Sequence, residues 1–170
     1  MANLLPEDEE LFQRIAREHI FVDPVLWALI YQYIGDQIIL INLTIRYYLD
    51  EGNPVPKEEA KKILKCTERM IALIKKLDHP EAISDDEKDS LFQIVKNEKL
   101  KLDPVTDELF GNYVRNDVNI INLVCIDYLD PLDERVAVSI KDAQRILEHT
   151  RSTMRFLDRL RIATARKEAY

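Results

Sequence analysis

Apolar side chains recur along this chain at intervals of three and four residues, which is the spacing of one face of an α-helix. The clearest runs cover residues 24–50 and 104–130. Their apolar positions are 25, 29, 33, 34, 38, 41, 45 and 48 in the first run, and 105, 109, 113, 114, 118, 121, 125 and 128 in the second. Both runs open on Asp-Pro, where Asp caps the first turn and Pro is tolerated at the first helical position. Each run therefore predicts one long helix.

The same pattern occurs twice. Residues 11–50 align with 91–130 at an offset of 80, and both copies contain the segments Leu-Phe-Gln, Asp-Pro-Val, Ile-Asn-Leu and Tyr-Leu-Asp. After residue 50 the offset becomes 83, so that Ala60, Ile63, Leu64, Thr67 and Leu77 match Ala143, Ile146, Leu147, Thr150 and Leu160. Each copy predicts three helices, at about 7–18, 24–50 and 57–78 in the first, and from Ser84, at 104–130 and at 139–165 in the second.

These elements predict an all-α fold, a six-helix bundle built from two tandem three-helix repeats with approximate internal two-fold symmetry. The first repeat covers residues 1–80 and the second 81–170. The hinge at 79–82 is short, so the two should pack together as a single compact unit. A helical solenoid is the main alternative. The segment Ser84-Asp85-Asp86-Glu87 has the form of a capping box and predicts the start of the fourth helix.

Composition narrows the class of protein. Only three glycines in 170 residues argue against a turn-rich β fold. Cys66 and Cys125 occupy non-equivalent positions of the repeat, inside helical patterns, which indicates reduced, buried thiols in a cytoplasmic protein. The first residues lack the basic start of a signal peptide. Asp36 and Arg46 interrupt the long apolar run, which favours a buried helix of a soluble protein and no membrane insertion.

Two sets of polar residues could carry a function. Asn42 and Asn122 are equivalent and lie mid-helix between aliphatic residues, where a buried amide must find a hydrogen-bond partner. They could fix the register of the bundle. Alternatively, they could line a polar pocket between the two long helices; the candidate pocket residues are Asp36, Asn42, Asn116 and Asn122.

The second set is a basic stripe in the last helix. Arg151, Arg155 and Arg159 recur every four residues, and residues 141–170 carry a net charge of +4 although the whole chain carries −7. The stripe could be a solvated face or a docking face for an acidic partner. A docking face requires these arginines to be exposed and free of internal carboxylates.

No catalytic motif stands out. The histidines are scattered, without the paired spacing of metal ligands, and there is no glycine-rich phosphate loop, so we expect no cofactor and no metal. By elimination, the sequence favours a non-enzymatic helical protein–protein interaction module with a regulatory or scaffold role and a protein partner, which could be a second copy of itself. The alternatives are a small-molecule sensor or enzyme that uses the polar pocket, and a nucleic-acid-associated protein that uses the basic C-terminal helix. The overall acidity makes nucleic acid the least favoured partner.

Overall fold

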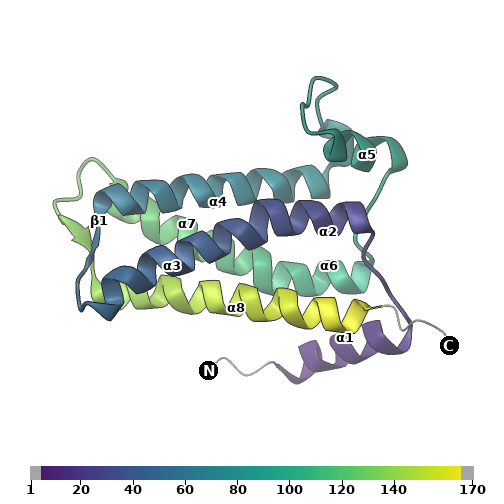
Figure 1. The fold of residues 1–170 in the computed structure, drawn as a ribbon, viewed down its shortest axis with the longest axis horizontal. Coiled ribbons are helices and arrows are strands. Elements are labelled where there is room, and N and C mark those ends of the chain that lie inside the picture. Colours follow the sequence, from purple (N-terminus) through teal and green to yellow (C-terminus); the bar gives the residue numbers. More distant parts are fainter. Residues whose placement is uncertain (1–4, 166–170) are drawn as a thin grey trace.

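The computed structural model describes residues 5–165, and its all-α architecture confirms the predicted fold class. Within these residues the chain forms six continuous helices (Figure 1). In the first copy they are α1 (Pro6–Arg17), a long helix made of α2 (Pro24–Ile30), a π-helical segment η1 (Tyr31–Gly35) and α3 (Asp36–Asp50), and α4 (Lys57–Asp78). In the second copy they are α5 (Ser90–Glu98), a long helix made of α6 (Pro104–Phe110), the π-helical segment η3 (Gly111–Arg115) and α7 (Asn116–Leu129), and α8 (Ile140–Thr164).

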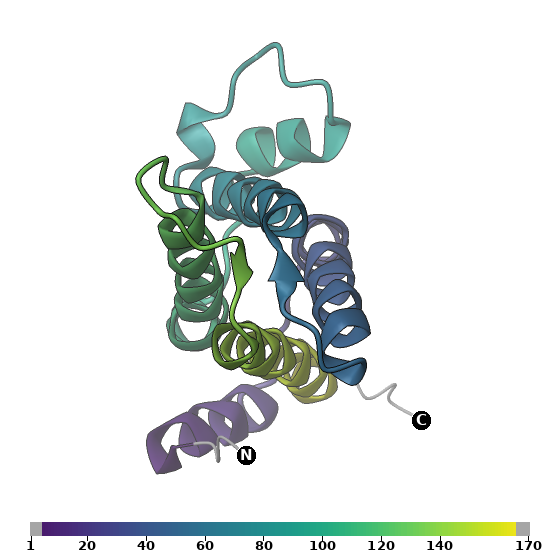
Figure 2. The same cartoon turned by 90° about the vertical axis from the view of Figure 1, so that its left-hand side faces the viewer.

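Four of these elements, α3, α4, α7 and α8, surround a common core (Figure 2). Helix α3 packs chiefly on α8, and α4 packs chiefly on α7. The long second helix of each copy is therefore buried mainly by the third helix of the other copy. Helices α3 and α7 lie at opposite corners of the bundle when it is viewed along its length (Figure 2).

Two equivalent hydrogen bonds cross the core and join the two copies. Asn42 Nδ2 donates to Thr150 Oγ1 at 3.0 Å, and Asn122 Nδ2 donates to Thr67 Oγ1 at 2.9 Å. Asn42 and Asn122 are equivalent in the repeat, as are Thr67 and Thr150. Each amide thus bonds the other copy's third helix, which supports the register role considered for the asparagines.

A short strand in each copy adds a contact that the helical pattern does not predict. Strands β1 (Val55–Pro56) and β2 (Ala137–Val138) pair antiparallel, with Val55 opposite Val138. These two valines are 83 residues apart, the offset of the repeat in this part of the chain, so equivalent residues face each other here too.

The first helix of each copy is held by a tyrosine of the other copy. Tyr113 Oη donates to Asp8 in α1, and Tyr33 Oη donates to Asp89 at the start of α5, both at 2.8 Å. Tyr33 and Tyr113 are equivalent residues. Helix α1 accordingly lies against α6 and α8, and α5 stands beyond α2 and α4, at the outer edge of the bundle (Figure 1).

The start of α5 differs from its prediction. The helix begins at Ser90, with the Asp89 side chain accepting a hydrogen bond from the backbone N–H of Leu91. Ser84 instead caps a turn, where its Oγ accepts from the N–H of Asp86. The side chain of Gln93 donates to the Ser84 carbonyl and thereby ties this turn to the helix. The proposed capping box is therefore wrong, because these contacts hold residues 84–87 outside the helix.

Other equivalences extend to the backbone. Helices α1 and α5 are each followed by a residue with positive φ, His19 at 55° and Lys99 at 53°, and the two are 80 residues apart. The π-helical segments, at 31–35 and 111–115, keep the same offset. The superposition of residues 7–78 on 85–162 as two rigid units stays a prediction.

Residues 24–50 form a helix long and apolar enough to cross a membrane by length and composition alone. In this structure 39% of its most apolar 18-residue window is buried inside the protein. Core helices of soluble proteins pass the same test.

Cys66 and Cys125 are both buried and free, as the sequence predicts, and burial raises the pKa of the Cys125 thiol to about 12.

We expect the protein to lose stability in alkali because of Tyr33 and Tyr113, the tyrosines that bond the first helix of each copy. Burial, and then the hydrogen bond to Asp89, raise the pKa of Tyr33 to about 12. Burial, and then the hydrogen bond to Asp8, likewise raise the pKa of Tyr113. The folded chain thus binds these phenol protons more tightly than the unfolded chain, whose tyrosines titrate near pH 10. The free energy of unfolding should therefore fall as the pH rises from about 10 towards 12.

Urea denaturation at a series of pH values measures this effect. The double variant Tyr33→Phe, Tyr113→Phe should start at lower stability because it lacks both hydrogen bonds, but should show a shallower pH dependence. An equal slope in the variant and the wild type would assign the alkaline loss to other groups.

Candidate functional site

A buried carboxylate lies between α7 and α8 in the second copy. Asp117, which is 3% exposed, is 2.8 Å from Nδ1 of His149 and accepts a hydrogen bond from Oγ1 of Thr153 at 2.9 Å. Asp117 comes from the first turn of α7, whereas His149 and Thr153 lie one turn apart on α8. A carboxylate that holds one imidazole nitrogen fixes the ring and leaves the other nitrogen for chemistry.

The side chain of His149 is partly open to solvent. Its exposed fraction is 23%. Within residues 5–165 no hydrogen bond to Nε2 is found. The imidazole is thus fixed on its inner side and free on its outer side.

This cluster belongs to the second copy alone. The equivalents of Asp117, His149 and Thr153 in the first copy are Gln37, Cys66 and Met70. There Oε1 of Gln37 is buried without a hydrogen-bond partner, and Cys66 and Met70 are buried. At these aligned positions only the second copy has the carboxylate and the imidazole.

A cavity of about 180 Å³ opens in the groove between α7 and α8, beside the Asp117–His149 cluster. Arg145 in its lining is one turn before His149 on α8, and Ile120 is one turn after Asp117 on α7. The cavity and the cluster are thus consecutive along the groove. The complete lining is Ile120, Leu123, Val124, Asp127, Tyr128, Asp142 and Arg145.

The carboxylates of this lining already have partners. Asp127 is paired with Arg135 at 2.8 Å, and Asp142 accepts the hydroxyl hydrogen of Tyr128 at 2.5 Å. For Arg145, no ion pair or hydrogen bond is found within the described part of the chain. Asp142 keeps its negative charge, because its partner Tyr128 is neutral. The guanidinium of Arg145 has no partner within the described residues, so its N–H groups are available to bond an anionic group.

The four residues of the polar pocket proposed from sequence differ in burial and in partners. Asp36 and Asn116 are exposed, whereas Asn42 is buried and Asn122 is partly buried. The two asparagines bond threonines of α8 and α4, as described above, and none of the four residues lines the cavity between α7 and α8. The two asparagines thus contribute to the packing of the bundle, and a common pocket of the four residues stays a prediction.

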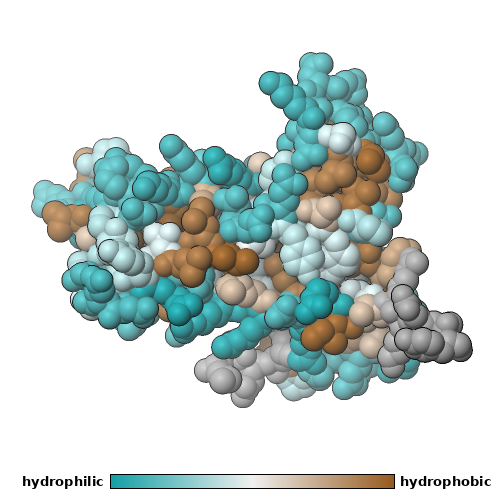
Figure 3. Space-filling view, in the orientation of Figure 1, coloured by the Kyte–Doolittle hydropathy of each residue, from teal (hydrophilic) through white to brown (hydrophobic). Residues whose placement is uncertain are grey.

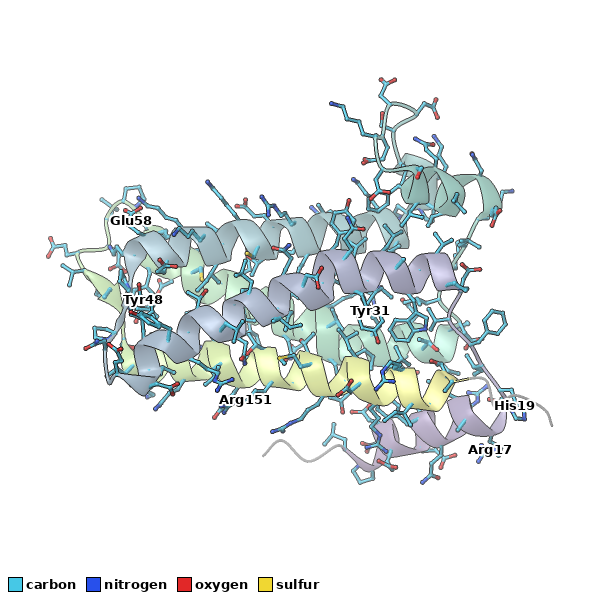
Figure 4. All side chains as sticks on the ribbon, viewed as in Figure 1. Arg17, His19, Tyr31, Tyr48, Glu58 and Arg151 are labelled. Carbon is cyan, nitrogen blue, oxygen red and sulfur yellow. The ribbon has the colours of Figure 1, made fainter. Side chains whose placement is uncertain are left out.

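The basic stripe is also divided. Arg151 and Arg155 are exposed, and Arg151 projects from α8 on the face of the bundle shown in Figure 4. Arg159 is paired with Glu9 of α1 at 2.5 Å, and its guanidinium carbon lies 4.7 Å from the ring centre of Phe12. Arg159 therefore does not meet the requirement of a docking face free of internal carboxylates; it fastens α1 to α8.

An exposed apolar stripe follows α3. Ile39, Leu40, Leu43 and Tyr47 are 46%, 52%, 56% and 63% exposed, and their spacing of three and four residues places them on one side of the helix. Figure 3 shows hydrophobic side chains gathered over the middle of this helix. We call these four residues the α3 face.

Among the described residues no group of three or more His, Cys, Asp or Glu side chains is placed to hold a metal ion. The chain has no significant match among known protein families, curated proteins or solved structures. The site must therefore be interpreted from its own geometry.

Sequence reasoning missed the cluster because Asp117 and His149 are 32 residues apart on different helices. A signal was nevertheless present. At three positions of the alignment, Gln37, Cys66 and Met70 give way to Asp117, His149 and Thr153. Two of these positions change from Cys and Met to polar residues, and the third changes from an amide to a carboxylate. Such a joint change, on helical faces that should be buried, marks a place where the second copy differs chemically from the first.

Proposed function

We propose that the protein is a helical interaction module that associates with a second copy of itself through the α3 face. The observation that carries the proposal is the exposure of four large apolar side chains in one stripe of a single helix. Apolar stripes of this kind are typical of protein–protein contact surfaces.

Charges at the ends of the α3 face favour a second copy as the occupant. Asp36 precedes the four apolar residues, and Arg46 directly precedes the last of them, Tyr47. Both charged residues are exposed. Neither forms an ion pair or a side-chain hydrogen bond within residues 5–165. If two α3 helices pack antiparallel about the level of residue 41, Asp36 of each chain meets Arg46 of the other.

This arrangement also brings apolar residues together. With the two-fold axis at that level, Ile39 of one chain faces Leu43 of the other, and the reverse contact follows by symmetry. A two-fold interface requires such a self-complementary surface, in which each contact occurs twice. The α3 face meets this requirement in both its apolar and its charged residues.

The proposal is tested by placing a charge in the centre of the face. Leu43→Glu should raise the dissociation constant of the dimer by at least about tenfold, because a carboxylate buried in an apolar contact costs more than about 1.4 kcal/mol. Sedimentation velocity over a concentration series measures the change. The matched control is Leu123→Glu, since Leu123 is the equivalent residue on α7 and is 63% exposed. This control should associate like the wild type.

Two outcomes would contradict the proposal. One is a wild-type protein that stays monomeric throughout the series. The other is a monomeric protein that floats with lipid vesicles and loses this binding in Leu43→Glu, which would assign the α3 face to a membrane surface.

A further inference from the structure

The fold does not require the buried carboxylate of the second copy. The first copy packs Gln37, Cys66 and Met70 at the same three positions and contains no charge there. Taking a carboxylate out of water is costly unless it is paired, and Asp117 is 3% exposed. A buried carboxylate that is present in one copy and absent from the other points to a role at the group it contacts, which is the imidazole of His149.

We propose that His149 is a phosphoryl-accepting residue, whose Nε2 takes a phosphoryl group from a donor with a phosphorus–nitrogen bond. Asp117 is the positioning residue. It is 2.8 Å from Nδ1, so that it holds the Nδ1–H and directs the lone pair of Nε2 outward to solvent. This inference is independent of association through the α3 face.

The transfer balances without any further reactant. The lone pair of Nε2 attacks phosphorus and forms a nitrogen–phosphorus bond, while the bond from phosphorus to the donor nitrogen breaks and its electron pair leaves with that nitrogen. The proton on Nδ1 stays in place, and the imidazole ring becomes positive. Asp117 then lies beside a cation that its negative charge stabilises.

The groove supplies a partner for the transferred group. Arg145 lies one helical turn before His149, and residues four apart on a helix are neighbours on its surface. Its guanidinium has no ion pair within residues 5–165 and can bond two phosphoryl oxygens at once. Asp127 of the adjacent cavity is paired with Arg135, and Asp142 accepts the hydroxyl hydrogen of Tyr128; neither carboxylate forms an ion pair with Arg145 in this structure.

The test uses the full chain and potassium phosphoramidate. Samples are quenched in alkali, and each histidine is quantified by peptide mass spectrometry. His19 and His79 serve as internal controls because both are more exposed than His149, and His19 lies at the end of α1 (Figure 4). We expect His149 to be labelled about tenfold faster than either, at Nε2 by phosphorus NMR. A rate at or below that of the two exposed histidines would overturn the proposal.

Two variants separate the charge of Asp117 from the packing around it. Asp117→Asn keeps the size of the side chain but removes the negative charge, and should lower the labelling rate of His149 to that of His19. Thr153→Val removes the other hydrogen bond of Asp117 without touching the imidazole, and should keep most of the rate. Circular dichroism checks the fold of both. Undiminished labelling in Asp117→Asn would contradict the role of the carboxylate.

Discussion

Asn42→Ala is expected to lower the free energy of unfolding by about 1–3 kcal/mol, the cost of losing a buried hydrogen bond. The amide is 5% exposed and bonds Thr150, which is fully buried. Thr150 also donates to the carbonyl of Leu147 at 2.6 Å, so the threonine keeps one bond when the amide is removed. The loss therefore reports on the contact between the two copies.

Asn122→Ala should also lower the free energy of unfolding, but by less, because Asn122 is only partly buried. Urea denaturation measures both variants. Asn119→Ala is the matched control, since this amide is exposed on α7 and changes at such positions usually stay within about 0.5 kcal/mol. If Asn42→Ala were as mild as the control, the amide would not contribute to the stability of the bundle.

A double-mutant cycle assigns the effect to the pair. Combining Asn42→Ala with Thr150→Val should cost less than the sum of the two single changes, with a coupling of about 0.5–3 kcal/mol. Additive losses would show that the two side chains stabilise the fold through separate contacts.

The helices of this protein could be predicted from its sequence because their signal is local. The periodicity of 24–50 and the Asp-Pro start place the first long helix within a residue of its observed ends, Pro24 and Asp50. The start of α5 could not be placed in this way. The capping-box pattern at Ser84 competes with side-chain contacts from Gln93 and Lys96, which hold the preceding turn outside the helix.

The candidate site was less accessible to sequence reasoning. The equivalence of Asn42 and Asn122 identified two residues that matter to packing, but not their threonine partners, which lie on other helices. Asp117 and His149 meet only because α7 packs on α8 at this level. A comparison of the two copies could have identified positions 117 and 149, because the residues there differ from those of the first copy. It could not have predicted that Asp117 lies 2.8 Å from Nδ1 of His149.

If two α3 faces pair antiparallel, as we propose, charge reversal at their ends should weaken the association. Asp36→Arg places like charges opposite each other at two points of the interface, because a two-fold axis repeats every contact. The dissociation constant should rise by about a hundredfold, since opposed like charges at an interface cost several kcal/mol. Arg46→Asp should have the same effect for the same reason.

The central claim, that two copies associate through α3, is tested most directly by combining these two changes. In the double variant Asp36→Arg, Arg46→Asp the charges are exchanged, so that the arginine introduced in one chain meets the aspartate introduced in the other. Sedimentation velocity should then show two weakened single variants and a double variant restored to the association of the wild type. A double variant as weak as the single ones, or single variants that associate like the wild type, would contradict the antiparallel α3 interface.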